Sequence, residues 1–226
     1  MISSSDLMKL VGRGGRLVPF FKAVCVYFVA GGGAPSPSAA ALKCAPVLCL
    51  LLCVLLRARA APHPQRQYAH CVAAGLLLSA AGDALLVWPQ YFMAGMAAFA
   101  GAHVAYICAF GLAEPRAYLA AVALYGGAVA YARAVPAPGP LRFIVPLYAL
   151  LLATMAWRGA ARPGYQRPGA LLFLLSDAIL GYSLFAGTVP YRQMLVMSTY
   201  YLGQLGITLS ALEPRAAHAH AHALAQ

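Results

Sequence analysis

The sequence predicts an all-α, polytopic membrane protein with about eight transmembrane helices. Of its 226 residues, 62% are hydrophobic and only 9% are charged, whereas soluble domains hold about a quarter charged residues. Eight apolar stretches approach the roughly 20 residues that a membrane-spanning helix needs. Basic residues are alternately abundant and scarce in successive connecting segments, as is typical of multi-pass proteins. No soluble domain fits between the stretches.

The eight predicted spans take up nearly the whole chain. Segments rich in Pro, Gly or Arg connect them, and this composition suits tight turns between helices. We therefore expect a basic cytosolic segment at residues 1–16, a transmembrane catalytic domain at 17–213 and a cytosolic His/Ala-rich tail at 214–226. The predicted spans are residues 17–33, 38–56, 68–88, 91–112, 116–133, 141–158, 168–187 and 193–212.

The distribution of charge predicts the orientation in the membrane. A net charge of +11 would be compatible with nucleic-acid binding, but its alternation from segment to segment favours topology as the cause, and no nucleic-acid partner is expected. The basic residues predict that both termini are cytosolic, because most fall on the side of the N-terminus. That side holds Lys9, Arg13, Arg16, Arg57, Arg59, Arg66, Arg116, Arg158, Arg162, Arg167 and Arg215, and the opposite side holds Arg133, Arg142 and Arg192.

Cysteine and histidine usage gives no sign of a metal centre. The six cysteines lie in or beside apolar stretches without a Cys-x-x-Cys pair, so we expect small buried side chains and neither a disulfide framework nor a zinc site. The tail alternates Ala and His, which favours a solvated end over a weak metal site. We expect no cofactor and no metal. Lys22 interrupts the first apolar stretch, which argues against a cleaved signal peptide.

Two carboxylates inside the apolar stretches are the strongest functional signal. Asp83 and Asp177 are two of only five acidic residues. They occur in similar segments, residues 82–88 and 176–182, with the pattern small residue, Asp, Ala, aliphatic, Leu, any residue, aromatic. Ionisable groups are costly in the membrane and mark functional sites there. Because four spans separate the two segments, both cross in the same direction, which is compatible with two parallel four-helix halves.

Other polar residues recur at helical spacing in the neighbouring spans. Gly75 and Ser79 precede Asp83 at four-residue steps, a small and polar stripe that favours close helix packing. His103 and Tyr106 share a face of the fourth span, and Tyr201 and Gln204 share one of the eighth. Each of these polar residues could serve only to join helices by hydrogen bonds.

Lys43 in the second span has two interpretations. It could extend to the membrane surface or pair with one of the two Asp residues. A carboxylate near a cation and a carboxylate without one can hold opposite protonation states, as an acid/base pair requires. The same arrangement would serve a proton-coupled lipid or solute carrier, and a purely structural role for the two Asp residues is a third alternative. Composition and spacing do not distinguish an acid/base catalyst from a carrier or from a structural role.

Five segments together resemble the YhhN-like family. They are residues 42–48 (LKCAPVL), 82–86 (GDALL), 92–106 (FMAGMAAFAGAHVAY), 169–177 (GALLFLLSD) and 198–204 (STYYLGQ). The resemblance runs in consistent order from about residue 20 to about residue 212. Within the family, the chain is most similar to the vertebrate lysoplasmalogenases. The family positions that it transfers to this chain are Lys43, Asp83, His103, Tyr106, Ser176, Asp177, Tyr200, Tyr201 and Gln204.

The resemblance implies an eight-span ether hydrolase of the endoplasmic reticulum membrane. Its substrate would be a lysoplasmalogen, whose vinyl ether is cleaved to a fatty aldehyde and glycerophosphocholine or glycerophosphoethanolamine. A homodimer is one candidate assembly. Asp83 and Asp177 would be catalytic, and the other seven transferred residues would bind substrate or support the site.

Vinyl ether hydrolysis suits a pair of unlike carboxylates. Protonation of the outer alkene carbon gives an oxocarbenium ion, which a nearby anion stabilises and water captures. We expect Asp177 to be the acid and Asp83 the stabiliser, because His103 belongs to the span that follows Asp83. A metal-assisted variant would use His103 and both Asp residues as ligands.

Overall fold

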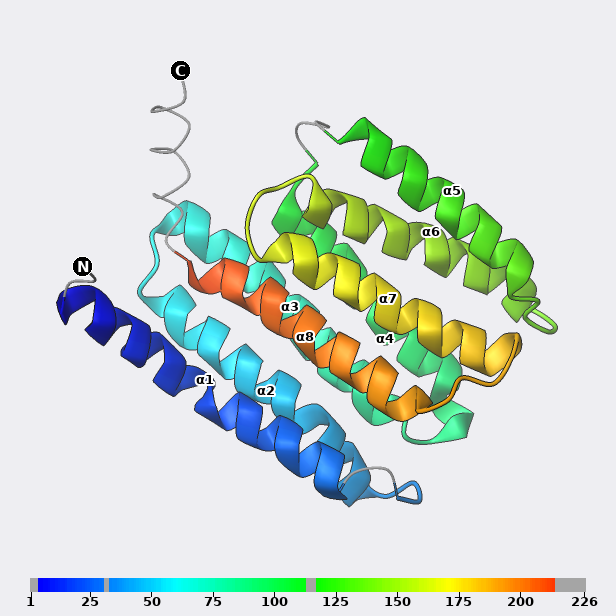
Figure 1. Cartoon of the computed structure of the whole chain (residues 1–226), viewed down its shortest axis with the longest axis horizontal. Coiled ribbons are helices and arrows are strands. Elements are labelled where there is room, and N and C mark those ends of the chain that lie inside the picture. Colours follow the sequence, from blue (N-terminus) through cyan, green and yellow to red (C-terminus); the bar gives the residue numbers. More distant parts are fainter. Residues whose placement is uncertain (1–3, 31–32, 113–116, 214–226) are drawn as a thin grey trace.

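The structure is a computed structural model that describes residues 4–30, 33–112 and 117–213, with side chains from residue 15 onward. These residues form a bundle of α-helices and contain no strand (Figure 1). The elements are α1 (Ser4–Ala30), α2 (Pro37–Arg59), α3 (His63–Leu85), the 3-10 turn η1 (Pro89–Tyr91), α4 (Phe92–Phe110), α5 (Tyr118–Ala134), α6 (Leu141–Ala160), α7 (Gln166–Phe185) and α8 (Arg192–Leu212). The predicted all-α class and the eight helices are confirmed.

The first helix differs from the prediction. α1 begins at Ser4 instead of near residue 17, so most of the expected basic segment continues the helix. Leu7, Met8 and Lys9 favour helix. The prediction started later because it counted only apolar residues, which mark the part of a helix that lies in the hydrocarbon layer. The predicted His/Ala-rich tail, residues 214–226, lies outside the described residues.

Five of the described helices are long and apolar enough to cross a membrane. They are α2, α3, α4 together with η1, α6 and α7. α5 has 17 residues, slightly fewer than a span usually needs, and α8 carries polar residues such as Gln193 and Gln204. The chain is therefore a multi-pass membrane protein, with five of its eight described helices meeting the criteria for a span.

The connections alternate between two ends of the bundle. α1 begins and α8 ends at the same end, which we call the terminal end (Figure 1). The opposite end, which we call the distal end, holds the connections at residues 86–91, 135–140 and 186–191. Arginines follow the predicted pattern in the described chain. Those near the terminal end are Arg57, Arg59, Arg66, Arg158, Arg162 and Arg167, and those near the distal end are Arg133, Arg142 and Arg192.

Helix packing repeats between the two halves of the chain. α1 packs on α2 as α5 packs on α6, α2 on α3 as α6 on α7, and α3 on α4 as α7 on α8. The contact between α2 and α8 has a counterpart between α6 and α4. Helices α1 to α4 therefore make the same main contacts as helices α5 to α8. This is the arrangement expected of two parallel four-helix halves.

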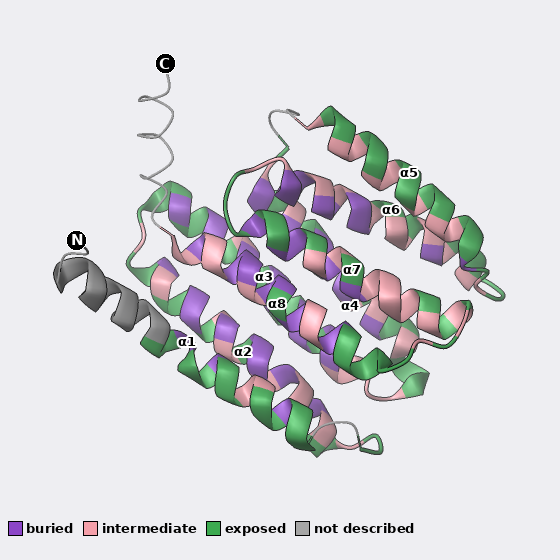
Figure 2. Ribbon diagram, in the orientation of Figure 1, coloured by how far each residue is buried: buried purple, intermediate pink, exposed green. Residues whose placement is uncertain are grey.

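Small residues bring the central helices close together. A Cβ atom added at Gly203 of α8 would lie 2.9 Å from the Phe173 nitrogen of α7, and one at Gly169 would lie 2.7 Å from the Ile207 nitrogen. Only glycine permits such an approach of two backbones. Buried residues accordingly gather along the facing sides of the inner helices, whereas α5 at the edge has no buried residue (Figure 2).

Candidate active site

Both predicted carboxylates line a single cavity of about 320 Å³. The cavity lies between helices α2 to α8, and most of its lining is apolar. Its polar lining consists of Lys43, Asp83, Tyr131, Tyr148, Ser176, Asp177 and Tyr200. Asp83 lies in the last turn of α3 and Phe92 in the first turn of α4, so these groups place one part of the cavity near the distal end of the bundle. Apolar pockets with a few convergent polar groups are typical of active sites.

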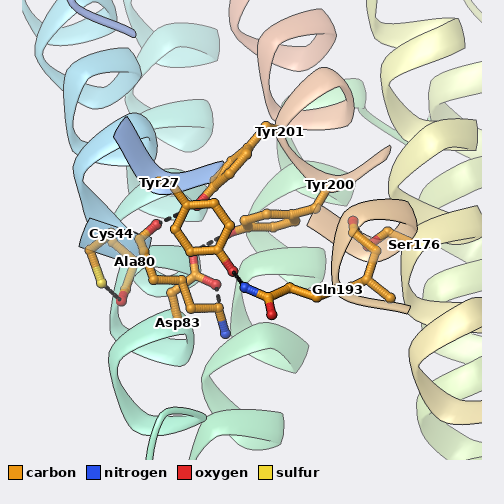
Figure 3. A network of polar contacts seen from close by, with 10 residues as sticks. Tyr27, Cys44, Ala80, Asp83, Ser176, Gln193, Tyr200 and Tyr201 are labelled. Carbon is orange, nitrogen blue, oxygen red and sulfur yellow. Dashed lines mark hydrogen bonds and ion pairs between the residues drawn. The ribbon is translucent and has the colours of Figure 1, made fainter. Parts of the chain in front are cut away.

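Asp83 is a buried carboxylate with a partner on each oxygen (Figure 3). Its residue is 1% exposed. The Lys43 Nζ lies 3.5 Å from Oδ1, and the Tyr200 hydroxyl donates a hydrogen bond of 2.6 Å to Oδ2. A carboxylate in the last turn of a helix is opposed by the helix dipole, and the Lys43 ammonium offsets this effect. Asp83 is thus held as one half of an ion pair.

The stripe predicted on α3 places Asp83 where these partners can reach it. Gly75 faces the Tyr106 ring, and a Cβ there would collide with that ring. Ser79 and Asp83 follow on the same face and are fully buried or nearly so. The predicted close packing of this stripe against another helix is confirmed, since Tyr106 belongs to α4.

Asp177 has a different set of partners. The Tyr148 hydroxyl of α6 donates a hydrogen bond of 2.6 Å to Oδ2. The His103 Nε2 of α4 lies 3.5 Å from the same oxygen and 3.0 Å from the Tyr148 hydroxyl. Within the described residues no protein group bonds to Oδ1, and the side chain is 13% exposed. One carboxylate oxygen is therefore open to the cavity.

The hydrogen bonds define the tautomer of His103. Tyr148 has one hydroxyl proton and gives it to Asp177, so the His103 Nε2 carries a hydrogen and donates to the Tyr148 oxygen. The His103 Nδ1 has no hydrogen-bond partner in the described part of the chain. The ring is fully buried, and its centroid lies 5.0 Å from that of Phe173. His103 thus holds the Tyr148 hydroxyl beside Asp177.

This geometry corrects one expectation. The order of the spans favours His103, beside Lys43, as a neighbour of Asp83, but His103 lies against Asp177. Adjacent helices touch along one face only, and His103 lies on the face of α4 that meets α6. The cation beside Asp83 is Lys43. No three His, Cys, Asp or Glu side chains in the described ranges are placed to hold a metal ion.

The other predicted site residues fall into two groups. Ser176 and Tyr200 line the cavity with Lys43 and the two Asp residues, although the Ser176 hydroxyl donates to the Val196 carbonyl at 2.9 Å. Tyr106, Tyr201 and Gln204 lie behind the lining. The Tyr106 hydroxyl donates to the Gln204 Oε1 at 2.7 Å, and the Tyr201 hydroxyl donates to the Lys43 carbonyl at 2.9 Å. Tyr201 thereby fixes the backbone that carries Lys43.

Sequence reasoning missed two tyrosines of the cavity. Tyr148 bonds Asp177 directly. The hydroxyl of Tyr131 on α5 donates to the Ala178 carbonyl at 2.8 Å. Tyr148 lies between Leu147 and Ala149 inside the sixth apolar stretch. A single tyrosine among aliphatic residues in the middle of a span could have marked it as a candidate site residue.

Comparison with known proteins now decides the family. The YhhN family model matches residues 38–211, a range that holds both Asp residues and every residue that lines the cavity. The chain belongs to the YhhN family. Its cavity, with the paired carboxylates, is thus contained in the part of the chain that defines this family.

Several curated relatives from mammals are similar over most of their length. The lysoplasmalogenase TMEM86B of Sus scrofa is 43% identical over 202 residues, 86% of this chain and 85% of that protein. TMEM86B of Homo sapiens is 40% identical over 210 residues, 87% of this chain and 86% of that protein. The lysoplasmalogenase TMEM86A of Homo sapiens is 37% identical over 238 residues, 95% of each. No solved structure matches the chain significantly.

Proposed function

We propose that this protein is a lysoplasmalogenase, which hydrolyses the sn-1 vinyl ether of lysoplasmenylcholine and lysoplasmenylethanolamine. The observation that supports this most is the unlike environment of two carboxylates in one apolar cavity. Asp83 pairs with the Lys43 ammonium, whereas Asp177 accepts a tyrosine hydroxyl beside a histidine and keeps one oxygen open. The curated relatives named lysoplasmalogenase support the same reaction.

The open oxygen favours Asp177 as the group that exchanges protons with the substrate. Tyr148 occupies Oδ2, so the reacting proton would be carried on Oδ1, which faces the cavity. Transfer of this proton to the outer alkene carbon converts the vinyl ether into an oxocarbenium ion. Water then adds to the inner carbon and returns a proton to Asp177. The resulting hemiacetal collapses when its hydroxyl proton passes to the ether oxygen, which releases aldehyde and alcohol.

The ion-paired carboxylate suits the second role. Asp83 keeps its negative charge through Lys43 and Tyr200, and a fixed charge in an apolar site stabilises a developing cation strongly. Glycosidase carboxylates divide the work in the same way around a related cation. Asp83 would act through its charge, because both of its oxygens already have protein partners.

The cellular setting is a further part of the proposal. The charge distribution supports a multi-pass arrangement with both termini in the cytosol, and the family resemblance suggests the endoplasmic reticulum membrane. The bound partner would be the lysolipid itself. Association into a homodimer is compatible with this setting.

Aldehyde release by the purified protein in detergent tests the reaction. The wild-type protein should release aldehyde from lysoplasmenylethanolamine but not from its saturated ether or ester analogue, because only the vinyl ether gives an oxocarbenium ion by protonation at carbon. Asp83→Asn and Asp177→Asn should each abolish release while the protein stays folded and inserted. Activity that survives either change would remove that residue from the mechanism.

A proton-coupled lipid carrier is the second candidate, favoured by the parallel packing of the two halves. Detergent micelles separate the two functions. A carrier needs two compartments and shows no turnover in micelles, whereas a hydrolase does. Absence of aldehyde from micelles, together with substrate movement into proteoliposomes, would replace the first proposal by the second.

A further inference from the structure

The cavity has an apolar part along α5 that the catalytic groups do not account for. Five residues of α5 line it: Ala123, Leu124, Gly127, Ala128 and Tyr131. They recur at three- and four-residue steps and so share one face of the helix. α5 packs along α6 at the edge of the bundle (Figure 1). We call these five residues the α5 wall.

The α5 wall begins beside the reacting groups. The Tyr131 hydroxyl reaches from α5 to the Ala178 carbonyl on α7 at 2.8 Å, and Ala178 directly follows Asp177. Gly181, one turn further along α7, leaves room for this hydroxyl, and a Cβ there would collide with it. A substrate atom at Asp177 therefore lies next to the Tyr131 end of the wall.

From Tyr131 the wall extends away from the distal end. Gly127 and Ala123 follow at four-residue steps toward the start of α5, and eight residues of helix cover about 12 Å. Leu152 and Ala153 of the neighbouring helix α6 also line the cavity. The vinyl ether joins a polar glycerol to a hydrocarbon chain, so the chain would run along this side.

The α5 wall also borders the lipid. Ala123 and Gly127 line the cavity and are exposed at the same time, as is Leu184 of α7. In a bilayer this flank between α5 and α7 faces acyl chains. A Cβ added at Gly127 meets no atom within 4 Å, so this position of the cavity lining has room for a larger side chain.

We propose, on the basis of the proposed function, that the α5 wall holds the hydrocarbon chain of the lysolipid and that Gly127 limits its length. The chain enters between α5 and α7 and lies against Gly127 and Ala123, with the vinyl ether next to Asp177. A larger side chain at position 127 would occupy the space of the methylenes that lie farther from the vinyl ether. It would leave the reacting bond untouched. Gly127 is thus a specificity-determining residue.

Two neighbouring glycines provide the variant and its matched control. Gly126 and Gly127 are both exposed residues of α5, and an added Cβ at either meets nothing within 4 Å. Only Gly127 lines the cavity. Gly127→Leu and Gly126→Leu add the same side chain to the same helix, so effects on folding are shared, whereas an effect on chain length belongs to position 127.

The test compares kcat/KM for lysoplasmenylethanolamines with a short and a long alkenyl chain. Gly127→Leu should lower the long-to-short ratio about tenfold, the effect of removing about two methylenes from apolar contact. Gly126→Leu should keep the wild-type ratio. Equal ratios in the two variants would overturn the proposal.

A binding measurement separates this proposal from the proposed function. Saturated 1-alkyl lysolipids of the same two chain lengths cannot react, and their dissociation constants can be measured for each variant. Gly127→Leu should weaken binding of the long chain selectively. If the wild-type protein releases no aldehyde but this selectivity is seen, the reaction is wrong and the chain site stands; if aldehyde is released and no selectivity is seen, the chain site is wrong.

Discussion

Asp83 and Asp177 each accept a tyrosine hydroxyl at 2.6 Å, yet the basic side chains beside them differ in kind. A lysine ammonium stands at Asp83 and a buried imidazole at Asp177. The two Asp residues have similar local sequences, but the side chains that surround them differ. Such inequality is what allows one carboxylate to remain a charge and the other to exchange a proton.

Tyr148 offers the sharpest test at the scale of single residues. Tyr148→Phe keeps the ring and removes the hydroxyl that bonds Asp177 and His103. We expect kcat to fall about 10- to 100-fold with KM little changed, since a hydrogen bond to a charged group contributes about 1.5–3 kcal/mol. The measurement is the rate of aldehyde release at saturating lysoplasmenylethanolamine.

Tyr125→Phe is the matched control for this change. Its hydroxyl bonds Thr154 at 2.8 Å, away from the cavity lining. This variant should keep nearly the wild-type kcat. A similar loss in both variants would mean that Tyr148 acts only in packing.

Part of the site could be predicted from the sequence. A carboxylate in an apolar stretch is visible without a structure, and so is a lysine such as Lys43. The partner of each Asp was not predictable, because it depends on how each helix is rotated about its axis. His103 follows Asp83 in the chain and still bonds across the bundle to Tyr148.

Among the helices, α7 and α8 carry three of the seven polar residues that line the cavity. Glycines bring the backbones of the two helices close together, and Ser176 and Asp177 of α7 line the same cavity as Tyr200 of α8. Gly203→Ala would place a Cβ 2.9 Å from the Phe173 nitrogen and 3.0 Å from the Gly169 oxygen, both backbone atoms. The two helices would have to move apart.

We expect Gly203→Ala to destabilise the protein by about 1–3 kcal/mol, the usual cost of overpacking, and to lower activity. Thermal unfolding in detergent measures the first effect. Gly126→Ala, where an added Cβ has open space, should not lower the unfolding temperature. An unchanged temperature for Gly203→Ala would contradict the close packing described for these helices.

Most helices could be located from apolar stretches, but their ends could not. The predicted third span starts at residue 68, whereas α3 starts at His63. His63, Gln65 and Arg66 are polar and lie beyond the apolar stretch, yet their backbone stays helical. Hydropathy marks the part of a helix that suits hydrocarbon, and the hydrogen-bonded backbone continues past that limit.

For the molecule as a whole, the alternation of charge predicts which ends face the cytosol. An Asn-x-Ser acceptor is glycosylated only on the luminal side of the endoplasmic reticulum membrane. An inserted segment with this acceptor in the distal connection 135–140 should be glycosylated. The same insertion in the connection 161–165 at the terminal end should not.

Gel mobility with and without glycosidase gives the result, and retained aldehyde release shows that the inserted protein is folded. Modification of the 161–165 insertion alone would reverse the proposed orientation. The parallel packing of the halves would survive that outcome, since it does not depend on which side is cytosolic.

The position of Asp83 in the last turn of α3 would make the reaction one-sided. A bond cut in the distal half of the bundle would belong to a lysolipid of the leaflet on that side, so a molecule in the other leaflet would first have to flip across the bilayer. The water-soluble glycerophosphodiester would then leave into the compartment opposite the termini, while the aldehyde stays dissolved among the acyl chains. Lipid flipping outside the protein would thus control how much substrate the protein reaches.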